Sequence, residues 1–403
     1  MEIYLDNAST TACFPEVADE VRDILCANYG NPSSAHHRGV EAEKQLRQAS
    51  TKLSALLRCR PEELIYTSGG TESDNMALLG AARARKRSGT HLITTVIEHP
   101  AVLRTMEQLE SEGFDVTYLP VDKDGIVRMD ALEQAISGDT TLVSVMYTNN
   151  EIGSVQPIAA IGAMLKRKYP QVIFHVDAVQ AFGKELIRPA ELGVDMMSVS
   201  AHKFHGPKGV GFLYVSGKVK LLPLIYGGGQ QRGLRSGTEN VAGIAGMASA
   251  AEKLLDGVKE ERERLFALKS FFVSGLLKLE NVRINGIPGV KTAEEGPAAG
   301  SEAFETAVRQ SSPAVVSASF PGVRAEVLLH ALEEDGIYVS AGSACATHKP
   351  EPSRTLQAIG LGKELLEGTI RFSFSVFTTK EELERTLEVL CRILPELRRY
   401  KGR

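Results

Sequence analysis

The chain has 403 residues, with 43% hydrophobic and 24% charged side chains and a formal net charge of -4. This composition is typical of a globular protein, and the length allows two domains. The small net charge gives no electrostatic reason to expect direct contact with nucleic acid. Residues 1–6 read as a short strand rather than a targeting signal, and no long apolar run predicts a membrane span. We therefore expect a cytoplasmic protein that binds neither nucleic acid nor membranes.

The first half of the chain predicts an α/β domain. Helical spacing of apolar residues indicates one helix that begins at Pro15 and a second that carries Ala42 to Leu56. After Glu63, short apolar runs alternate with helical patterns, which favours a mostly parallel sheet covered by helices on both faces. The expected strands are 64–66, 92–96, 116–119, 142–146, 172–176 and 196–199.

The second half predicts a smaller α+β domain. A long helical region begins near Glu239, and a later amphipathic helix carries one apolar stripe, formed by Leu383, Leu387, Leu390 and Leu394. Residues 289–312 lack strong periodicity, so we expect an exposed insertion or a frayed helix there. Strands are expected at 282–284, 314–319 and 369–373. The expected division is a large α/β domain over 15–257 and a small α+β domain made of 1–14 and 258–403.

Five cysteines are scattered along the chain without a C-x-x-C pair. This pattern predicts neither a disulfide framework nor a zinc knuckle, so reduced thiols are expected. Cys26 and Cys391 fall on apolar faces of predicted helices, where we expect them to be part of the core. Cys345 instead lies in a loop of small residues after a strand. Such a loop suits a reactive nucleophile, and the neighbouring His348 and Lys349 could help to form its thiolate.

Lys203 stands in segment 198–211, among hydroxyl, imidazole and glycine residues just after an apolar strand. A partly desolvated lysine amine loses its charge easily and can form a Schiff base with an aldehyde cofactor, of which pyridoxal phosphate is the obvious one. The alternative is a solvated surface lysine in a Gly/Pro-rich loop. His202 and His205 have an H-x-x-H spacing, but a loop does not place them on one helical face and no third ligand is evident, which argues against a metal site.

Polar residues also follow other predicted strands. Asp177 ends one strand at the edge where open α/β sheets bind ligands, and its carboxylate could hold a pyridine nitrogen protonated or simply cap a helix. Gln180 could then meet the phenolic oxygen of the ring. His99 could stack on a flat ring or move protons, against the alternative of a structural histidine. Asn150 offers an amide at the same edge, and Arg371 is a candidate clamp for a substrate α-carboxylate, against an ordinary surface ion pair.

A phosphate site is expected where the first strand of the sheet runs into a helix. Gly69, Gly70 and Thr71 form a glycine pair followed by a hydroxyl residue, and backbone N–H groups at a helix start favour an anion. The alternative is a capping box without a ligand, and the lack of Gly-Lys-Ser/Thr argues against a nucleotide P-loop. The glycine-rich segment 227–238 adds two arginines and suits phosphate or carboxylate, also across a subunit boundary.

Taken together, these segments resemble the cysteine desulfurases of the NifS/IscS type, in the aminotransferase class V group of fold-type I pyridoxal phosphate enzymes. The resemblance implies a homodimer whose large domain has a mostly parallel seven-stranded sheet and whose smaller domain is α+β. The matching segments are spread over nearly the whole chain, at 4–11, 30–34, 67–72, 98–99, 149–153, 176–180, 200–203, 235–238 and 342–345.

The resemblance also implies a role for each candidate residue. Lys203 would bear the cofactor, whose ring would be contacted by Asp177, Gln180 and His99. The cofactor phosphate would be held at Gly70 by Thr71, Ser200, His202 and, from the partner subunit, Thr238. The amino acid would be bound by Asn150, which would also lie against the cofactor, and by Arg371.

By this resemblance the chain would take sulfur from L-cysteine, leave L-alanine and hold the sulfur as a persulfide on Cys345. The acceptor would be an iron–sulfur scaffold protein or a tRNA-thiolating enzyme. A selenocysteine lyase or a class V transaminase would share the cofactor apparatus, but a transaminase has no use for Cys345. An idle sulfur-relay scaffold is a further alternative, against which the complete set of site residues speaks. The chain departs from the family pattern at Gln231, where Glu is usual, and at Ser375–Val376, where Gly-Arg is common.

Overall fold

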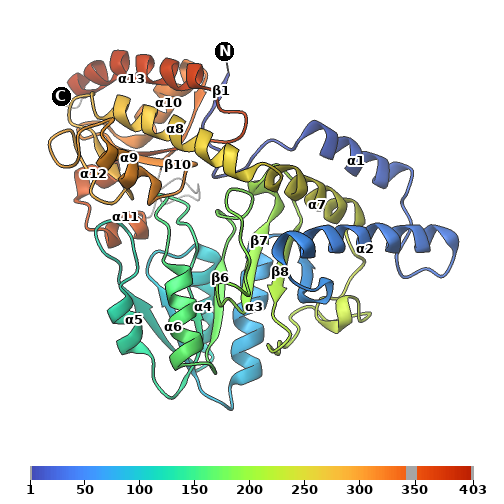
Figure 1. Cartoon of the computed structure of the whole chain (residues 1–403). Helices are drawn as coiled ribbons and strands as arrows, with labels where there is room; N and C mark the ends of the chain where they lie inside the picture. The colour runs from blue at the N-terminus through green and yellow to red at the C-terminus, as the bar shows by residue number, and fades with distance from the viewer. Residues whose placement is uncertain (1, 342–351, 401–403) are drawn as a thin grey trace.

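A computed structural model describes residues 2–341 and 352–400 of the chain (Figure 1). Its main feature is a seven-stranded sheet in the order β2-β8-β7-β6-β5-β3-β4. All of these strands except β4 at the edge consist of buried residues, as expected for a sheet covered on both faces. The strands are β2 (Leu64–Thr67), β3 (His91–Thr95), β4 (Asp115–Leu119), β5 (Thr140–Ser144), β6 (Ile173–Asp177), β7 (Met196–Ser200) and β8 (Gly211–Val215).

The predicted α/β class with a mostly parallel sheet is confirmed, but the hydrophobic pattern does not predict β8. This strand pairs antiparallel with both β2 and β7, whereas the other neighbouring strands are parallel. Between β7 and β8 the chain forms no helix longer than the single turn that includes Lys203. It therefore interrupts the alternation of strands and helices from which the other strands were expected.

Helices cover the sheet and extend from it (Figure 1). Those that follow its strands are α3 (Gly70–Arg85), α4 (Pro100–Ser111), α5 (Met129–Ala135) and α6 (Ile158–Lys168). The predicted helix starts at Pro15 and Pro100 are confirmed, because proline is well tolerated in the first turn of a helix. Two N-terminal helices, α1 (Pro15–Cys26) and α2 (His37–Leu57), contact α7 (Val241–Leu255) and form an arm beside the sheet.

A second hydrophobic core is built by the C-terminal part of the chain together with the N-terminus. Its sheet has the order β12-β13-β10-β9, from β9 (Arg283–Asn285), β10 (Val315–Ser319), β12 (Ser340–Ala341) and β13 (Thr369–Ser373). Its main helices are α8 (Val258–Leu276), α9 (Glu302–Arg309), α10 (Ala325–Glu334) and α13 (Lys380–Tyr400). Shorter helices are α11 (Arg354–Ala358) and α12 (Lys363–Glu367).

The N-terminal strand joins the second core rather than the first. β1 (Ile3–Tyr4) pairs in parallel with β11 (Ile337–Tyr338), and Ile3 is buried against the second core. The chain then turns through residues 6–12 toward the large sheet before α1 begins at Pro15. As a result, a short N-terminal segment lies between the two cores.

One sequence expectation holds only in part, and another is wrong. Residues 289–312 are not simply an exposed insertion, because α9 forms there and buries Phe304 and Val308 fully; exposed residues are concentrated in 293–300. Ser301 caps α9, and the two buried side chains are one helical turn apart, a pattern too short to stand out among Gly, Ala and Glu residues. Cys26 and Cys391 are exposed rather than part of the core, because each faces solvent from its helix.

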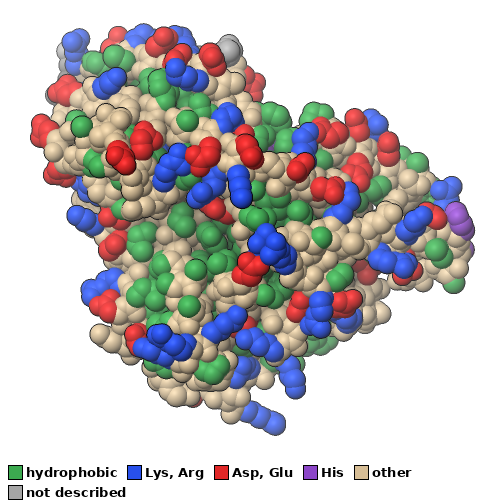
Figure 2. Space-filling model, viewed as in Figure 1, with side chains coloured by type: hydrophobic (Ala, Val, Ile, Leu, Met, Phe, Trp, Pro, Cys, Tyr) green, Lys and Arg blue, Asp and Glu red, His purple; other side chains and the backbone are tan. Residues whose placement is uncertain are grey.

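The surface carries both signs of charge. Figure 2 shows Lys and Arg side chains interspersed with Asp and Glu side chains over the face in view. Within 2–341 and 352–400, the longest apolar stretch of any helix is too short or too charged to cross a bilayer.

Candidate functional site

The candidate site lies where three parallel strands of the large sheet end. β6 ends at Asp177, and β7 ends at Ser200, directly before the single helical turn Ala201–Lys203. β3 is followed by the turn that leads to His99, the residue that caps α4. Because the carboxyl ends of parallel strands meet at one edge of a sheet, the predicted residues from these strands come together.

The N-terminal turn between the two cores reaches this edge. The Lys203 Nζ donates hydrogen bonds to the main-chain oxygens of Ala8 at 2.7 Å and Ser9 at 2.8 Å. The Gln180 Nε2 donates to the same Ala8 oxygen at 2.9 Å. The amine of Lys203 and the amide of Gln180 thus share one acceptor, the Ala8 oxygen.

Asp177, His99 and Lys203 are close enough to influence one another. Burial raises the pKa of Asp177, while His99, the Val179 N–H and Lys203 all favour its charged form. Desolvation lowers the pKa of His99; the Asp177 carboxylate opposes this shift and the Lys203 charge adds to it. The His99 Nδ1 accepts from the Ala101 N–H at 3.1 Å, so a neutral ring carries its proton on Nε2.

A buried polar layer that the sequence does not predict lies behind Asp177. Burial, followed by repulsion from Asp177, raises the pKa of Asp74, and burial raises the pKa of Glu98 to about 8. The ring of His175 is bonded on both sides by hydroxyls, Ser144 Oγ and Ser198 Oγ, each at 2.9 Å. Burial lowers the pKa of His175 to about 3. Lys203 and His99 therefore favour the charged form of Asp177, while burial favours the neutral forms of the two acids behind it.

The start of α3 borders an open hollow of about 360 Å³. Gly69 has a φ of +148°, and a Cβ added at Gly70 would come within 2.7 Å of the Val179 side chain. The helix start therefore presents bare backbone to the hollow, a favourable setting for an anion. Predicted residues that line it are Gly70, Thr71, Ser200 and His202, and Lys208 and Thr10 line it as well.

The glycine-rich segment 227–238 lies beside this hollow. The Arg235 Nε donates to the Glu72 carboxylate at 2.9 Å, so the acid nearest the hollow is paired. The Gln231 amide accepts from the Tyr66 N–H at 2.6 Å and donates to the Tyr66 oxygen at 2.8 Å, which extends the edge of β2. Thr238 is exposed and is not among the described residues that line the hollow.

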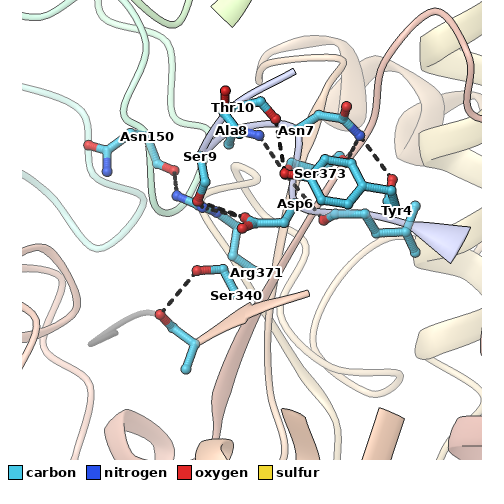
Figure 3. A network of polar contacts seen from close by, with 12 residues as sticks. Tyr4, Asp6, Asn7, Ala8, Ser9, Thr10, Asn150, Ser340, Arg371 and Ser373 are labelled. Atoms are coloured by element: carbon cyan, nitrogen blue, oxygen red, sulfur yellow. Dashed lines mark hydrogen bonds and ion pairs between the residues drawn. The ribbon is translucent and has the colours of Figure 1, made fainter. Parts of the chain in front are cut away.

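Arg371 lies on β13 at the other side of the N-terminal turn (Figure 3). Its side chain is 9% exposed. Nη1 donates to the Asn150 main-chain oxygen at 2.8 Å, and Nη2 donates to Asp6 Oδ1 at 2.8 Å and to Ser9 Oγ at 2.7 Å. Nε is buried with no hydrogen-bond partner among the described residues. Asn150 and Arg371, both predicted to bind the amino acid, are thus joined through the main chain of Asn150.

Cys345, His348 and Lys349 lie outside the described residues. The described chain before them ends in β12, where Ser340 is directly opposite Arg371 in the β12–β13 pairing. The described chain after them begins the helix α11, which Ser353 caps by accepting from the Leu356 N–H at 3.1 Å. Ser353 also donates to the half-buried Glu151 carboxylate. Both flanks are therefore anchored close to Arg371 and to the loop that carries Asn150.

Comparison with known proteins identifies the family. The model of the aminotransferase class-V family matches residues 3–386. The cysteine desulfurase IscS of Dictyoglomus turgidum is 42% identical over 398 residues, covering 98% of this chain and 95% of the relative. The chain belongs to the aminotransferase class-V family, among the IscS-type cysteine desulfurases.

Solved structures agree with this assignment. A NifS-like protein superposes with a TM-score of 0.88 at 39% identity, covering 98% of this chain and 100% of that one. SspA, solved in complex with cysteine, superposes with a TM-score of 0.75 at 30% identity, covering 94% of this chain and 100% of that one. The seven-stranded sheet expected from the family resemblance is confirmed.

The residues present fit the cofactor of this family, pyridoxal phosphate. The glycine-lined hollow at the start of α3 suits a phosphate. The Gln180 Oε1 is buried without a hydrogen-bond partner among the described residues, so it can accept a hydrogen bond from a bound group. The buried Asp177 carboxylate, at the same edge as the Lys203 amine, suits a protonated ring nitrogen.

Sequence reasoning missed the residues of the N-terminal turn. Segment 4–11 matches the family pattern, but no role is predicted for Asp6, Ala8 or Ser9, which bind Arg371 and Lys203. Main-chain oxygens carry no side-chain signal, and the 190 or so residues between this turn and Lys203 hide the contact. Lys208 at the hollow was also missed, since a lysine in a Gly/Pro loop looks like an ordinary surface charge.

Proposed function

We propose that this chain is a cysteine desulfurase that uses pyridoxal phosphate to take sulfur from L-cysteine, releasing L-alanine and holding the sulfur as a persulfide on Cys345. The observation that carries the proposal is the convergence of Lys203, Asp177 and the hollow at the start of α3 on one sheet edge. The desulfurase relatives and the cysteine complex of SspA support L-cysteine as the substrate.

When bound, pyridoxal phosphate supplies an aldehyde that captures amines and an electron-poor ring that weakens bonds at the α-carbon of an amino acid. Lys203 would bear it, and the carboxylate of Asp177 would keep a proton on the ring nitrogen. The Gln180 amide would meet the phenolic oxygen, and the neutral His99 ring would stack on the cofactor. The phosphate would be held at Gly70 by Thr71, Ser200, His202 and, from a second copy of the chain, Thr238.

Arg371 would hold the α-carboxylate of cysteine, with Asn150 beside it and against the cofactor. The guanidinium is planar and charged and presents parallel N–H groups that match a carboxylate. Lys203 lies on the other side of the N-terminal turn, where its amine would take a proton from the α-carbon of the substrate. Arg371 would thus bind the carboxylate of the amino acid, and Lys203 would act at its amine end.

Cys345 would act as the nucleophile toward sulfur. Its thiolate would attack the substrate sulfur, so that an S–S bond forms and the C–S bond breaks. The electron pair of the broken bond stays with the carbon skeleton, which takes up a proton and leaves as alanine. The support from the described residues is that Ser340 and Ser353, on the two flanks of Cys345, are fixed beside Arg371 and Glu151.

The wider setting is part of the proposal. The protein would be a cytoplasmic homodimer that passes sulfur to an iron–sulfur scaffold protein or a tRNA-thiolating enzyme. The unpaired cysteines Cys13, Cys26, Cys59 and Cys391 suit a reducing compartment. The chain would divide into a large domain over 15–257 and a small domain made of 1–14 and 258–403. Support comes from the two cores, one with residues between Phe14 and Leu254 and one that combines Ile3 and Leu5 with residues from Leu265 onward.

The test is to incubate the cofactor-loaded protein with L-cysteine and to measure alanine and protein-bound sulfur in the same sample. We expect equal amounts of both in the first turnover. Lys203→Ala should form neither, and Cys345→Ser should form no protein persulfide, whereas Cys391→Ser, which changes an exposed cysteine, should behave as the wild type. A wild-type protein that forms no alanine would overturn the proposal, and a Cys345→Ser variant with undiminished persulfide would overturn the role of Cys345.

A further inference from the structure

The Arg371 guanidinium is already engaged by groups of its own chain (Figure 3). Both N–H groups of Nη2 are in use, one toward Asp6 Oδ1 at 2.8 Å and one toward Ser9 Oγ at 2.7 Å. One N–H of Nη1 donates to the Asn150 oxygen at 2.8 Å. A guanidinium has five N–H groups, so the Nε–H and one Nη1–H remain for a ligand.

These two remaining donors cannot form a two-pronged contact with a carboxylate. A carboxylate binds a guanidinium through two parallel N–H groups on one edge, either Nη1 with Nη2 or Nε with Nη2. Both edges include Nη2, which is occupied by Asp6 and Ser9. A substrate carboxylate that binds in this way must therefore displace one of these two contacts.

Asp6 is itself a carboxylate, and it is held firmly in this place. Ser9 Oγ donates to Asp6 Oδ1 at 2.8 Å, and the Ser9 N–H donates to the Asp6 main-chain oxygen at 3.0 Å. Asp6 is also bridged to Ser373, two residues beyond Arg371 on β13. The Asp6 carboxylate thus already makes, within the chain, the kind of contact with Arg371 that a ligand carboxylate would make.

We propose that Asp6, supported by Ser9, competes with the α-carboxylate of the amino acid for Arg371 and thereby lowers the affinity of the site for both substrate and product. The proposal rests on the role of Arg371 in the proposed function. Its physical reason is that a nearly buried guanidinium without an anion is costly. Arg371 therefore pairs with Asp6 when no amino acid is bound. The same pairing would favour release of alanine after each turnover.

The alternative is that Asp6 and Ser9 simply hold Arg371 in the right orientation, and the two accounts predict opposite signs. If Asp6 competes, Asp6→Asn should tighten carboxylate binding, because the amide oxygen still accepts a hydrogen bond but no longer repels a second anion. Ser9→Ala should act in the same direction by freeing one Nη2 hydrogen. If they only orient Arg371, both changes should weaken binding.

The experiment compares L-alanine with ethylamine, which is alanine without its carboxylate. Each is titrated into the cofactor-loaded protein, and binding is followed through the visible absorption of the cofactor, so no turnover is needed. We expect Asp6→Asn to bind alanine at least five-fold more tightly, Ser9→Ala at least two-fold more tightly, and neither to change ethylamine binding by more than two-fold. The control is Asp335→Asn, because Asp335 pairs with arginines and has the same 21% side-chain exposure as Asp6; it should change neither ligand.

The outcomes separate this inference from the proposed function. If the wild type does not prefer alanine to ethylamine, Arg371 is not the carboxylate clamp and the proposed function loses that residue. If the wild type shows the preference but Asp6→Asn and Ser9→Ala leave alanine binding unchanged or weaken it, the competition by Asp6 is refuted. Ser9→Ala keeps the main-chain oxygen that accepts from Lys203, so it tests the idea even if Asp6→Asn folds poorly.

Discussion

Lys269 offers a test of how the loop that carries Asn150 is supported. Its side chain is fully buried on α8, where Nζ donates to Ser311 Oγ and to the Ser312 main-chain oxygen, both at 2.7 Å. The Ser312 N–H in turn donates to the Gly153 oxygen at 2.8 Å, at the end of that loop. Burial lowers the pKa of Lys269 to about 7.

The magnitude follows from linkage between protonation and folding. Below pH 7 the lysine is charged in both the folded and the unfolded protein, so the full cost of burying the charge is present. Between pH 7 and the unfolded pKa of 10.5, the unfolded chain binds more protons than the folded one, so stability rises with pH. Each pH unit corresponds to about 1.4 kcal/mol, which gives roughly 2–3 kcal/mol between pH 7 and pH 9.

The assay is urea unfolding of the wild type and of Lys269→Met, followed by circular dichroism at pH 7 and pH 9. We expect the free energy of unfolding of the wild type, measured relative to Lys269→Met, to increase by roughly 2–3 kcal/mol between these pH values. Lys363→Met is the control, because Lys363 is 88% exposed and should give a difference that does not change with pH. A difference for Lys269→Met that also stays constant would show that Lys269 is not held in its neutral form.

Three further predictions concern the site itself. Asp177→Asn should lower the rate of alanine formation about a hundred-fold or more while the protein still folds, because a neutral amide cannot keep a ring nitrogen protonated; a rate within ten-fold of the wild type would contradict the role of Asp177. Gly70→Ala should weaken binding of pyridoxal phosphate about ten-fold in equilibrium dialysis, because the new Cβ would lie 2.7 Å from the Val179 side chain. Gly138→Ala, where a Cβ meets nothing within 4 Å, should leave that affinity unchanged. Gln231→Glu should lower the free energy of unfolding by about 1–3 kcal/mol, because a carboxylate cannot donate to the Tyr66 oxygen; an unchanged melting temperature would count against it.

Much of the candidate site at the carboxyl edge of the large sheet is predictable from the sequence, because several of its residues end a strand or begin a helix. Asp177 ends a buried apolar strand, and Gly70 and Thr71 follow the first strand of the sheet. Parallel strands bring their carboxyl ends to one edge, so local patterns suffice to place these residues near one another. The position of His99 at the start of α4 follows in the same way.

Contacts that join distant segments could not be predicted. The hydrogen bonds from Lys203 to Ala8 and Ser9 link residues nearly two hundred positions apart and use main-chain oxygens that every residue has. The pairing of Arg371 with Asp6 depends on β1 joining the second core and β13 placing its arginine beside the returning chain. Neither hydrophobic periodicity nor motif spacing contains this information.

The sequence by itself determined the α/β class, the mostly parallel sheet and the side chains offered at its carboxyl edge, because these follow from local patterns of apolar residues, glycines and helix caps. Only the tertiary structure decided which partner each of those side chains has. The packing of two hydrophobic cores around the N-terminal turn sets Lys203 and Arg371 on either side of Ser9, and it gives Arg371 an internal carboxylate, Asp6. That arrangement depends on how distant parts of the chain pack, which no local segment specifies.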